Sequence, residues 1–355
     1  MVTVIIPTLR RPLLLARAIR SVQAQTATDL TIAVTDNASR DGTRDVVASM
    51  MARDPRIRYH EQPKDLGPHA NFQHALERVD TPYFTLLSDD DLMLPDFLAQ
   101  SLSELEREPK AMFVASPVLL VDPEGTLLKL DGDKWRPGMH HPPQGLLDMT
   151  RNGHFIWTGT VFRTSLRGMV RLDPRTGNSS DMDFQLQVAA RFPFVTSGRP
   201  GAIFSWHPQS PTSHPDLGQF WPTWGTIMAN LDAVDTLPQA VRSQAIANLD
   251  GRLHRSLVLV GLYAASRRRW DDAAGTARLL TQRYGDVAAA AMIGATAWLA
   301  RRLPIMPPVL SWVAWRLRWA GRGRLTSLQR ELVTRHGPLL AVEGVAEPRR
   351  KDSAA

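Results

Sequence analysis

Three consecutive carboxylates stand where a buried strand is expected to end. Asp89, Asp90 and Asp91 follow the apolar run at 83–88. Adjacent carboxylates repel one another, so a fold tolerates them in an enclosed place mainly when a cation compensates their charge. Open α/β sheets bind ligands at the carboxyl ends of their strands. The triplet is therefore a candidate cation site; the alternative is an acidic turn in which Asp91 caps the next helix.

A second acidic turn occupies residues 36–43, after another expected strand at 30–35. Asp41 and Thr43 are typical of a helix cap with an Asx turn. Asp36 differs, because it terminates the strand directly and faces the same sheet edge as the triplet. Its carboxylate could accept an N–H from a nucleobase. The sequence has neither G-x-G-x-x-G nor G-x-x-x-x-G-K-[ST], which argues against a dinucleotide fold and a P-loop enzyme.

The elements that must position these residues alternate between strand and helix. Apolar, β-branched runs predict buried strands and longer amphipathic segments predict helices. This alternation predicts an α/β fold, with a mainly parallel sheet and helices on both faces. The expected strands are 2–7, 30–35, 57–62, 83–88, 111–121, 154–163 and 202–206, and the expected helices are 12–25, 43 onward, 67–79, 95 onward and 181–192, with loops at 122–150.

Composition excludes several kinds of chemistry. The 355 residues contain no cysteine, which rules out disulfides, thiolate metal sites, iron–sulfur clusters and a cysteine nucleophile. A strand already at 2–7 leaves no visible signal peptide, so we expect a cytoplasmic protein. No charge-free apolar run of about 18 residues predicts a membrane span.

The character of the chain changes near residue 215. We expect a catalytic domain at 1–215, a helical region at 216–340 and a disordered tail at 341–355. The net charge is +7, and residues 301–330 hold seven arginines and no acid. The rest of the chain is then formally neutral, which predicts a local basic patch rather than a nucleic-acid-binding surface.

Tryptophans accompany these arginines. Trp312, Trp315 and Trp319 fall on one side of an expected helix. Tryptophan and arginine on an amphipathic helix are typical of a membrane interface. This favours contact of 301–330 with an anionic membrane, peripherally at its inner face. A helix packed on the catalytic domain or on a partner subunit is the alternative, and both stay open.

Four motifs in order resemble one known family. They are the strand 2–8, the turn 36–43, Gly67 with Asn71, and the stretch 88–95. Together they resemble the family 2 glycosyltransferases of the GT-A fold, over roughly residues 1–215. The resemblance implies inverting transfer of a sugar from a nucleotide diphosphate, with Mg²⁺ or Mn²⁺. A UDP-sugar is the favoured donor, and a glycan or lipid-linked hydroxyl is the expected acceptor.

The resemblance also assigns residues to the donor. Asp36 would contact the base, Asp89 the ribose and Asp90 the metal ion, which a diphosphate leaving group needs for its developing charge. Ser88 departs from the pattern, because many members carry aspartate there. The nucleotide-binding residues implied by the family are Pro7, Thr8, Asp36, Asn71 and Asp89.

The catalytic base is implied in the same way. An inverting transfer needs a base for the acceptor hydroxyl proton. The resemblance places Asp181 in this role, with Asp183 in support, although the family's glutamate is Ser180 here. Acids at a helix start are also favoured by the helix dipole alone. His207 matches a family histidine close to the metal or diphosphate, with an ordinary polar loop residue as the alternative.

Two other classes of function compete. A nucleotidyltransferase would also use a carboxylate pair and a metal, but residues 9–12 lack the glycines of its nucleotide loop. A non-catalytic sugar-binding or scaffold protein would have lost the acidic residues, and they are present. The donor sugar, the acceptor, the linkage and the oligomeric state are not decided by the sequence.

Overall fold

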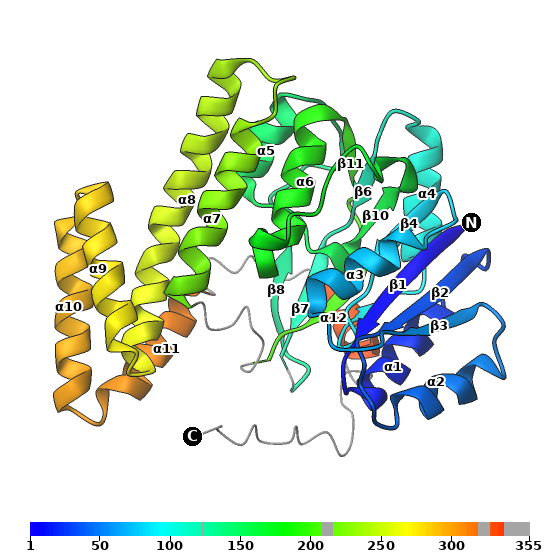
Figure 1. Ribbon diagram of the computed structural model, residues 1–355, viewed down its shortest axis with the longest axis horizontal. Helices are drawn as coiled ribbons and strands as arrows, with labels where there is room; N and C mark the ends of the chain where they lie inside the picture. The colour runs from blue at the N-terminus through cyan, green and yellow to red at the C-terminus, as the bar shows by residue number, and fades with distance from the viewer. Residues whose placement is uncertain (123, 208–215, 319–326, 337–355) are drawn as a thin grey trace.

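The protein is built around a sheet of eight strands, and the two acidic turns near the N-terminus each follow one of these strands. The computed structural model describes residues 1–122, 124–207, 216–318 and 327–336 (Figure 1). The strand order is β3-β2-β1-β4-β10-β6-β11-β9, and the first four are parallel. The strands are β1 (Val2–Thr8), β2 (Leu30–Asp36), β3 (Ile57–Glu61), β4 (Tyr83–Leu86), β6 (Phe113–Ala115), β9 (Gly138–His140), β10 (Thr160–Arg163) and β11 (Phe194–Thr196).

Alternation along β1 explains why both faces of this sheet are covered. Val4 and Ile6 pack into one apolar cluster with α1 (Pro12–Gln23) and α2 (Thr43–Met51). Ile5 points to the other face and joins the cluster that contains Phe72 and Leu76 of α3 (Pro68–Glu77). Successive side chains of a strand point to opposite faces, so a largely apolar run such as β1 is buried on both. The predicted α/β class is confirmed.

A second, four-stranded sheet follows the first. Its order is β5-β12-β7-β8, from β5 (Leu92–Met93), β12 (Ala202–Ser205), β7 (Val118–Val121) and β8 (Leu127–Asp131). The single strand expected over 111–121 is therefore wrong, since β6 and β7 belong to different sheets. Pro117 lies between them and has no N–H to donate to a strand ladder.

The expectation of loops at 122–150 is also wrong. β8 pairs with β7, β9 pairs with β11, and α5 (Gln144–Asn152) buries Leu146 and Met149. The prolines and glycines of this segment are typical of loops, so these short elements could not be predicted from local sequence. β9, for example, forms only by pairing with β11, which is distant in sequence. Likewise, the strand expected at 154–163 begins only at Thr160, after a 3-10 turn at Trp157–Gly159.

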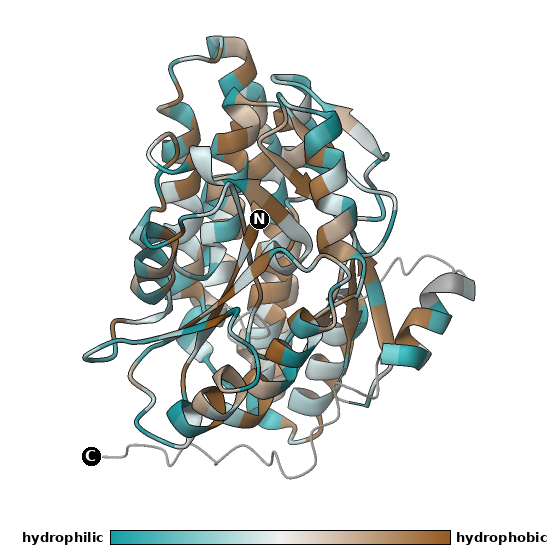
Figure 2. Ribbon diagram, turned by 90° about the vertical axis from the view of Figure 1, so that its right-hand side faces the viewer, coloured by the Kyte–Doolittle hydropathy of each residue, from teal (hydrophilic) through white to brown (hydrophobic). Residues whose placement is uncertain are grey.

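Helices dominate the C-terminal part, as predicted. They are α7 (Leu217–Asp232), α8 (Gln239–Ser266), α9 (Trp270–Tyr284), α10 (Val287–Arg302), α11 (Met306–Arg318) and α12 (Ser327–His336). α8 packs against α5, α9 and α11, whereas Val333 of α12 packs on the second sheet. Figure 2, coloured by hydropathy, shows helices with both hydrophilic and hydrophobic bands around strands that are largely hydrophobic. Over the described residues, no helix has the length and hydropathy that crossing a bilayer requires.

The division of the chain at residue 215 stays a prediction. One apolar cluster includes Phe84 of the large sheet, Phe184 of α6 (Ser180–Arg191) and Leu257 of α8. The catalytic and helical regions therefore share core packing. The tail expected at 341–355 lies outside the described residues.

Candidate active site

The carboxylate triplet lies in a turn that connects the two sheets. β4 ends at Leu86 in the large sheet, and β5 begins at Leu92 in the second sheet. Between them, the backbone N–H of Asp91 donates to the carbonyl of Ser88 over 3.0 Å. The turn places the three aspartates beside the carboxyl end of β1, at the edge where open α/β sheets bind ligands.

Asp91 is a buried structural residue and does not cap a helix. Its carboxylate accepts a hydrogen bond of 2.7 Å from Thr158 Oγ1 and one of 2.9 Å from the backbone N–H of Ser205. Burial, together with the charge of Asp90, raises the pKa of Asp91 well above its ordinary value. The capping alternative is wrong, because α4 (Phe97–Arg107) starts after Asp96 and Asp91 instead joins the second sheet to the 3-10 turn.

Asp89 and Asp90 face a cation supplied by the first loop. Arg11 Nη1 lies 3.3 Å from Oδ1 of Asp89 and 2.9 Å from Oδ2 of Asp90. Thr8 Oγ1 donates to Oδ2 of Asp89 over 2.7 Å. The predicted nucleotide-binding residues Thr8 and Asp89 therefore touch each other. Arg11 was not predicted as a site residue, although it lies three residues after Thr8, at the end of β1.

The two carboxylates differ in their electrostatics. Burial and the charge of Asp90 raise the pKa of Asp89 to about 6, against the opposing effects of Arg11 and Thr8. Burial also opposes ionisation of Asp90, but the hydrogen bond from His207 and the charge of Arg11 outweigh it and hold its pKa below its ordinary value. Asp90 is therefore the group that stays ionised most readily, as a metal ligand must.

His207 lies beside Asp90, where the sequence predicted a second metal ligand. Its Nε2 is 3.5 Å from Oδ2 of Asp90. Arg17 and the Ser205 hydroxyl both donate to the backbone carbonyl of Asp90, which fixes the turn. Within the part of the chain that the structure describes, no three histidine, aspartate or glutamate side chains converge as a complete metal site. A cation here would complete its coordination with ligand oxygens and water.

Asp36 lies on the adjacent strand, level with Thr8. The two residues pair in the β1–β2 register, so both strand ends reach the same edge. Asp36 is buried, and its Oδ2 accepts a hydrogen bond of 2.6 Å from the Tyr59 hydroxyl, while its Oδ1 accepts from the Ser39 N–H over 2.9 Å. Burial and the bond to Asp36 raise the pKa of Tyr59. No motif points to Tyr59, which lies on β3, 23 residues along the chain from Asp36.

Asn71 anchors α3 to the end of β2. Its Oδ1 accepts from Thr35 Oγ1 over 2.8 Å, and its Nδ2 donates to the Thr35 carbonyl over 3.0 Å. Pro7 lies opposite Thr35 in the register of β1 and β2. These contacts support the wall of the predicted nucleotide site; direct binding of nucleotide by Pro7 or Asn71 stays a prediction.

The predicted base, Asp181, is the more open of two acids in α6. Oδ2 of Asp181 lies 3.2 Å from Nε2 of His154, and the Asp181 side chain is 27% exposed. Asp183 is 2% exposed and accepts hydrogen bonds from Asn230 and Gln187. Burial raises the pKa of Asp183 to about 6. Asp181 can therefore meet an acceptor hydroxyl, whereas Asp183 holds α7 against α6.

Segment 154–159 links the base to the carboxylate turn. His154 contacts Asp181, the Phe155 backbone exchanges two hydrogen bonds with the Gln185 side chain of α6, and Thr158 donates to Asp91. Trp157 is 9% exposed, and its ring centre lies 4.7 Å from that of Phe72. It is a core side chain. The sequence did not single out His154, because it faces Asp181 only in the folded chain.

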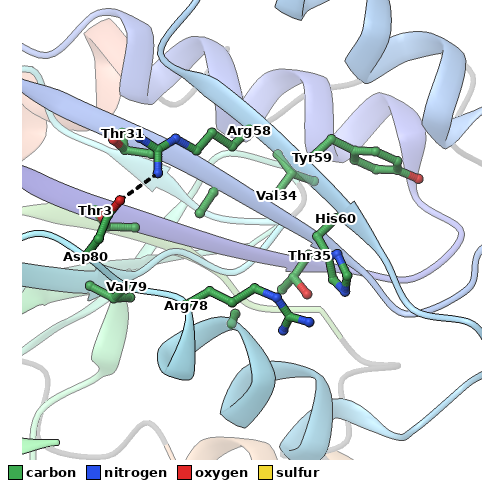
Figure 3. Close-up of a pocket in the computed structure, with 12 residues that line it drawn as sticks. Thr3, Thr31, Val34, Thr35, Arg58, Tyr59, His60, Arg78, Val79 and Asp80 are labelled. Atoms are coloured by element: carbon green, nitrogen blue, oxygen red, sulfur yellow. Dashed lines mark hydrogen bonds and ion pairs between the residues drawn. The ribbon is translucent and has the colours of Figure 1, made fainter.

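A separate pocket opens on the α3 side of the sheet. It encloses about 200 Å³ between β1, β2, β3 and the carboxyl end of α3 (Figure 3). Arg58, His60 and Arg78 line it, and Arg58 pairs with Asp80 over 3.0 Å. None of the carboxylates at the strand ends lines this pocket. It is therefore distinct from the candidate active site.

The N-terminal part of the chain, which carries the carboxylate turn, is similar in sequence to known proteins. Residues 3–167 match the family model described as "Glycosyl transferase family 2". A beta-1,3-glucosyltransferase of Campylobacter jejuni, named for GalNAc(5)-diNAcBac-PP-undecaprenol, is 36% identical over 128 residues. That match covers 36% of this chain and 40% of the relative. The chain spans less than two thirds of the length of the curated relatives it matches.

Solved structures resemble nearly the whole chain in fold. TarS of S. aureus in complex with UDP-GlcNAc gives a TM-score of 0.60 at 14% identity, over 91% of this chain and 93% of TarS. A mannosyltransferase of Pyrobaculum calidifontis, solved with GDP-Man and Mn²⁺, gives a TM-score of 0.50 at 16% identity, over 96% of this chain and 84% of that one. At these identities, the likeness is evidence of the fold alone.

Proposed function

The chain carries a family 2 glycosyltransferase domain with a GT-A fold, and from that premise we propose an inverting, metal-dependent transfer of a sugar from a nucleotide diphosphate. The observation that carries the proposal is the cluster around Asp89 and Asp90. Arg11 lies 3.3 Å from the carboxylate of Asp89 and 2.9 Å from that of Asp90, and His207 lies 3.5 Å from Asp90. Such a cluster can hold a metal–diphosphate group.

The donor would bind along the ends of β1, β2 and β4. Asp36 is held by Tyr59 and Ser39 with its carboxylate at the edge of the sheet, where it can accept an N–H from a base. Asp89 follows β4, on the other side of β1 from Asp36. Its carboxylate can accept a hydrogen bond from a ribose hydroxyl. A UDP-sugar is the favoured donor, because uracil offers an N–H to a carboxylate. The TarS complexes with UDP and UDP-GlcNAc support this choice by analogy of fold.

The residues at this site fit a divalent cation. The pKa of Asp90 is held below its ordinary value and His207 lies beside it, while burial first and the charge of Asp90 second raise the pKa of Asp89. Asp90 and His207 would hold Mg²⁺ or Mn²⁺. Such a cation stabilises the negative charge that develops on a diphosphate leaving group. Arg11, which contacts Asp89 and Asp90, would pair with the oxygens of the same diphosphate.

Asp181 would act on the acceptor. It would take the proton of the attacking hydroxyl, on the face of the sugar opposite the diphosphate. His154 positions its carboxylate through the contact at Oδ2, and Asp181 lies in the first turn of α6. The acceptor that we favour is a lipid-linked glycan, by analogy with the undecaprenol-linked substrate in the name of the Campylobacter jejuni relative.

Nucleotide release from sugar donors tests this proposal. Purified protein is incubated with UDP-, dTDP- and GDP-sugars, each with Mn²⁺, Mg²⁺ or EDTA, and the released nucleotide is quantified. We expect release from a UDP-sugar that EDTA abolishes and that is lost in Asp90→Ala. The Arg53→Gln variant, changed at an exposed residue away from the site, is the matched control. Equal release in EDTA would overturn the role of the metal.

A further inference from the structure

The outer face of α10 is apolar although it is exposed. Residues 287–300 contain no charged side chain. Met292 is 41% exposed and Trp298 is 56% exposed, while Ile293 and Ala300 on the inner face are buried. An exposed helix of a soluble domain normally carries polar side chains on its outer face. This helix instead exposes large apolar groups over its full length.

The same surface continues beyond the end of α10. Leu303 and Ile305 in the following turn are 45% and 68% exposed, and Val309 and Trp312 on α11 are 41% and 58% exposed. We call this set of exposed side chains on two consecutive helices and the turn between them the α10–α11 surface: Met292, Trp298, Leu303, Ile305, Val309 and Trp312. Large apolar side chains exposed together in this way mark a site of interaction.

Arginines accompany the large rings of this surface. The guanidinium carbon of Arg302 lies 4.0 Å from the ring centre of Trp298, and that of Arg316 lies 5.2 Å from the ring centre of Trp312. Both arginines are exposed. Residues 287–330 contain no aspartate or glutamate, so the segment supplies no charge of its own to neutralise them. The surface therefore combines apolar side chains with arginines in a segment that has no acid.

We propose that the α10–α11 surface binds the anionic headgroups and the interfacial region of a lipid bilayer. Tryptophan and aliphatic side chains enter the interface, and arginines pair with lipid phosphates. A second copy of the chain fits this surface less well. A symmetric contact would bring Arg302 and Arg316 of both copies together, with no acid from 287–330 to separate them.

The structure alters the membrane surface expected from the sequence. Trp312 is exposed, but Trp315 is partly buried and packs against the cluster of the second sheet that contains Val118 and Leu120. Trp319 lies outside the described residues. Trp298, which the sequence analysis did not use, takes the outer position instead. α10 is the outermost helix of the C-terminal group in Figure 1, far along the molecule from the ends of β1 and β2.

Truncation near residue 300 would be a poor test, because Leu310 and Ala314 of α11 are buried against the core. Substitutions of exposed residues avoid this difficulty. We would compare the full-length chain with Trp298→Ser/Trp312→Ser and with Arg302→Gln/Arg316→Gln. Each variant is mixed with phosphatidylcholine vesicles, with and without phosphatidylglycerol, and co-sedimented. Thermal unfolding checks that each variant folds.

The wild-type protein should sediment with the phosphatidylglycerol vesicles, less so at high salt, and little with phosphatidylcholine alone. The double arginine variant should bind about thirtyfold more weakly, since each arginine near an anionic surface contributes about a fivefold factor. The tryptophan variant should also lose binding. Neither donor nor acceptor is present, so the result is independent of the proposed transfer.

Two controls make the comparison specific. Met169→Ser removes an exposed apolar side chain, and Arg53→Gln/Arg107→Gln removes two exposed charges elsewhere. Both should bind vesicles as the wild type does. Equal sedimentation of all variants would overturn the proposal. The proposal would also be overturned if the wild-type protein did not bind anionic vesicles but formed a concentration-dependent dimer that the tryptophan variant did not form.

Discussion

Nε2 of His154 lies 3.2 Å from Oδ2 of Asp181, and the segment that carries this histidine also binds the carboxylate turn through Thr158 and Asp91. The acid proposed as base and the acids proposed to hold the donor are therefore connected by only six residues, 154–159. Movement of this segment would shift both groups together. This connection explains how one short stretch can set the position of an acceptor base relative to a donor site.

Asp181→Asn should retain donor binding and lose transfer. The amide is nearly isosteric but cannot accept the hydroxyl proton, and loss of a general base lowers the rate by about 10²–10⁴-fold. Single-turnover transfer and calorimetric UDP binding would be measured on the same preparation. Asp183→Asn is the neighbouring comparison. Normal transfer by Asp181→Asn, with transfer lost in Asp183→Asn, would reassign the base to Asp183.

Asp91→Ala should destabilise the protein, whereas Asp91→Asn should be tolerated. Alanine leaves the Thr158 hydroxyl and the Ser205 N–H without their acceptor, at about 1–3 kcal/mol for each buried group. Asparagine still accepts the Ser205 N–H and offers its amide to the Thr158 oxygen. Urea unfolding of both variants measures the difference. Equal stabilities would show that Asp91 does not join the sheets as described.

Asp183 should make the stability depend on pH in a defined direction. Burial raises its pKa to about 6 in the folded protein, above the value of about 4 in an unfolded chain. The folded state therefore binds the proton more tightly, and the free energy of unfolding falls as the pH rises from about 4 through 6. The loss from this one group is at most ~3 kcal/mol.

The Asp183→Asn variant isolates this effect. It has no proton to lose, so its free energy of unfolding should fall less than that of the wild type over the same pH range. Denaturant unfolding at several pH values measures both slopes, and the contribution of Asp91 is common to the two proteins. Parallel slopes would mean that Asp183 titrates normally in the folded state.

Tyr59→Phe should weaken UDP binding through Asp36. The phenol donates 2.6 Å to Oδ2 of the buried carboxylate, and its loss leaves only Ser39 to orient Asp36. A hydrogen bond to a charged group contributes about 1.5–3 kcal/mol, which bounds the effect at roughly 10- to 150-fold in Kd. Fluorescence or calorimetric titration with UDP measures it. Unchanged affinity in both Tyr59→Phe and Asp36→Ala would move the base-binding site elsewhere.

The first half of the large sheet could be predicted from the sequence with little error. β1 and β2 are long, buried and largely apolar, whereas β3 buries only Ile57, and each of the three is followed by a clear turn or helix signal. The acidic turns could be placed at one edge because parallel strands share their direction. The division of 111–121 between two sheets could not, since it depends on which strands pair with each piece, and that pairing comes from distant residues.

The acidic residues of the candidate site could be named from the sequence, but the residues that hydrogen-bond to them could not. Asp36, Asp90 and Asp181 follow recognisable motifs, so their positions could be inferred. Tyr59 and His154 carry no local signal, and their roles arise only when β3 meets β2 and when segment 154–159 meets α6. The role of Asp91 could also be assigned only from the structure. In the sequence, a helix-capping aspartate cannot be distinguished from a buried one that accepts hydrogen bonds from Thr158 and Ser205.

The most direct test of the account is the affinity of UDP in the presence and absence of Mn²⁺, measured by calorimetry for the wild type, Asp90→Ala and Asp91→Asn. The account places the cation on Asp90, with the diphosphate completing its coordination. Mn²⁺ should therefore tighten UDP binding in the wild type and in Asp91→Asn, and should have no effect in Asp90→Ala. An equal response to Mn²⁺ in Asp90→Ala would contradict the central claim.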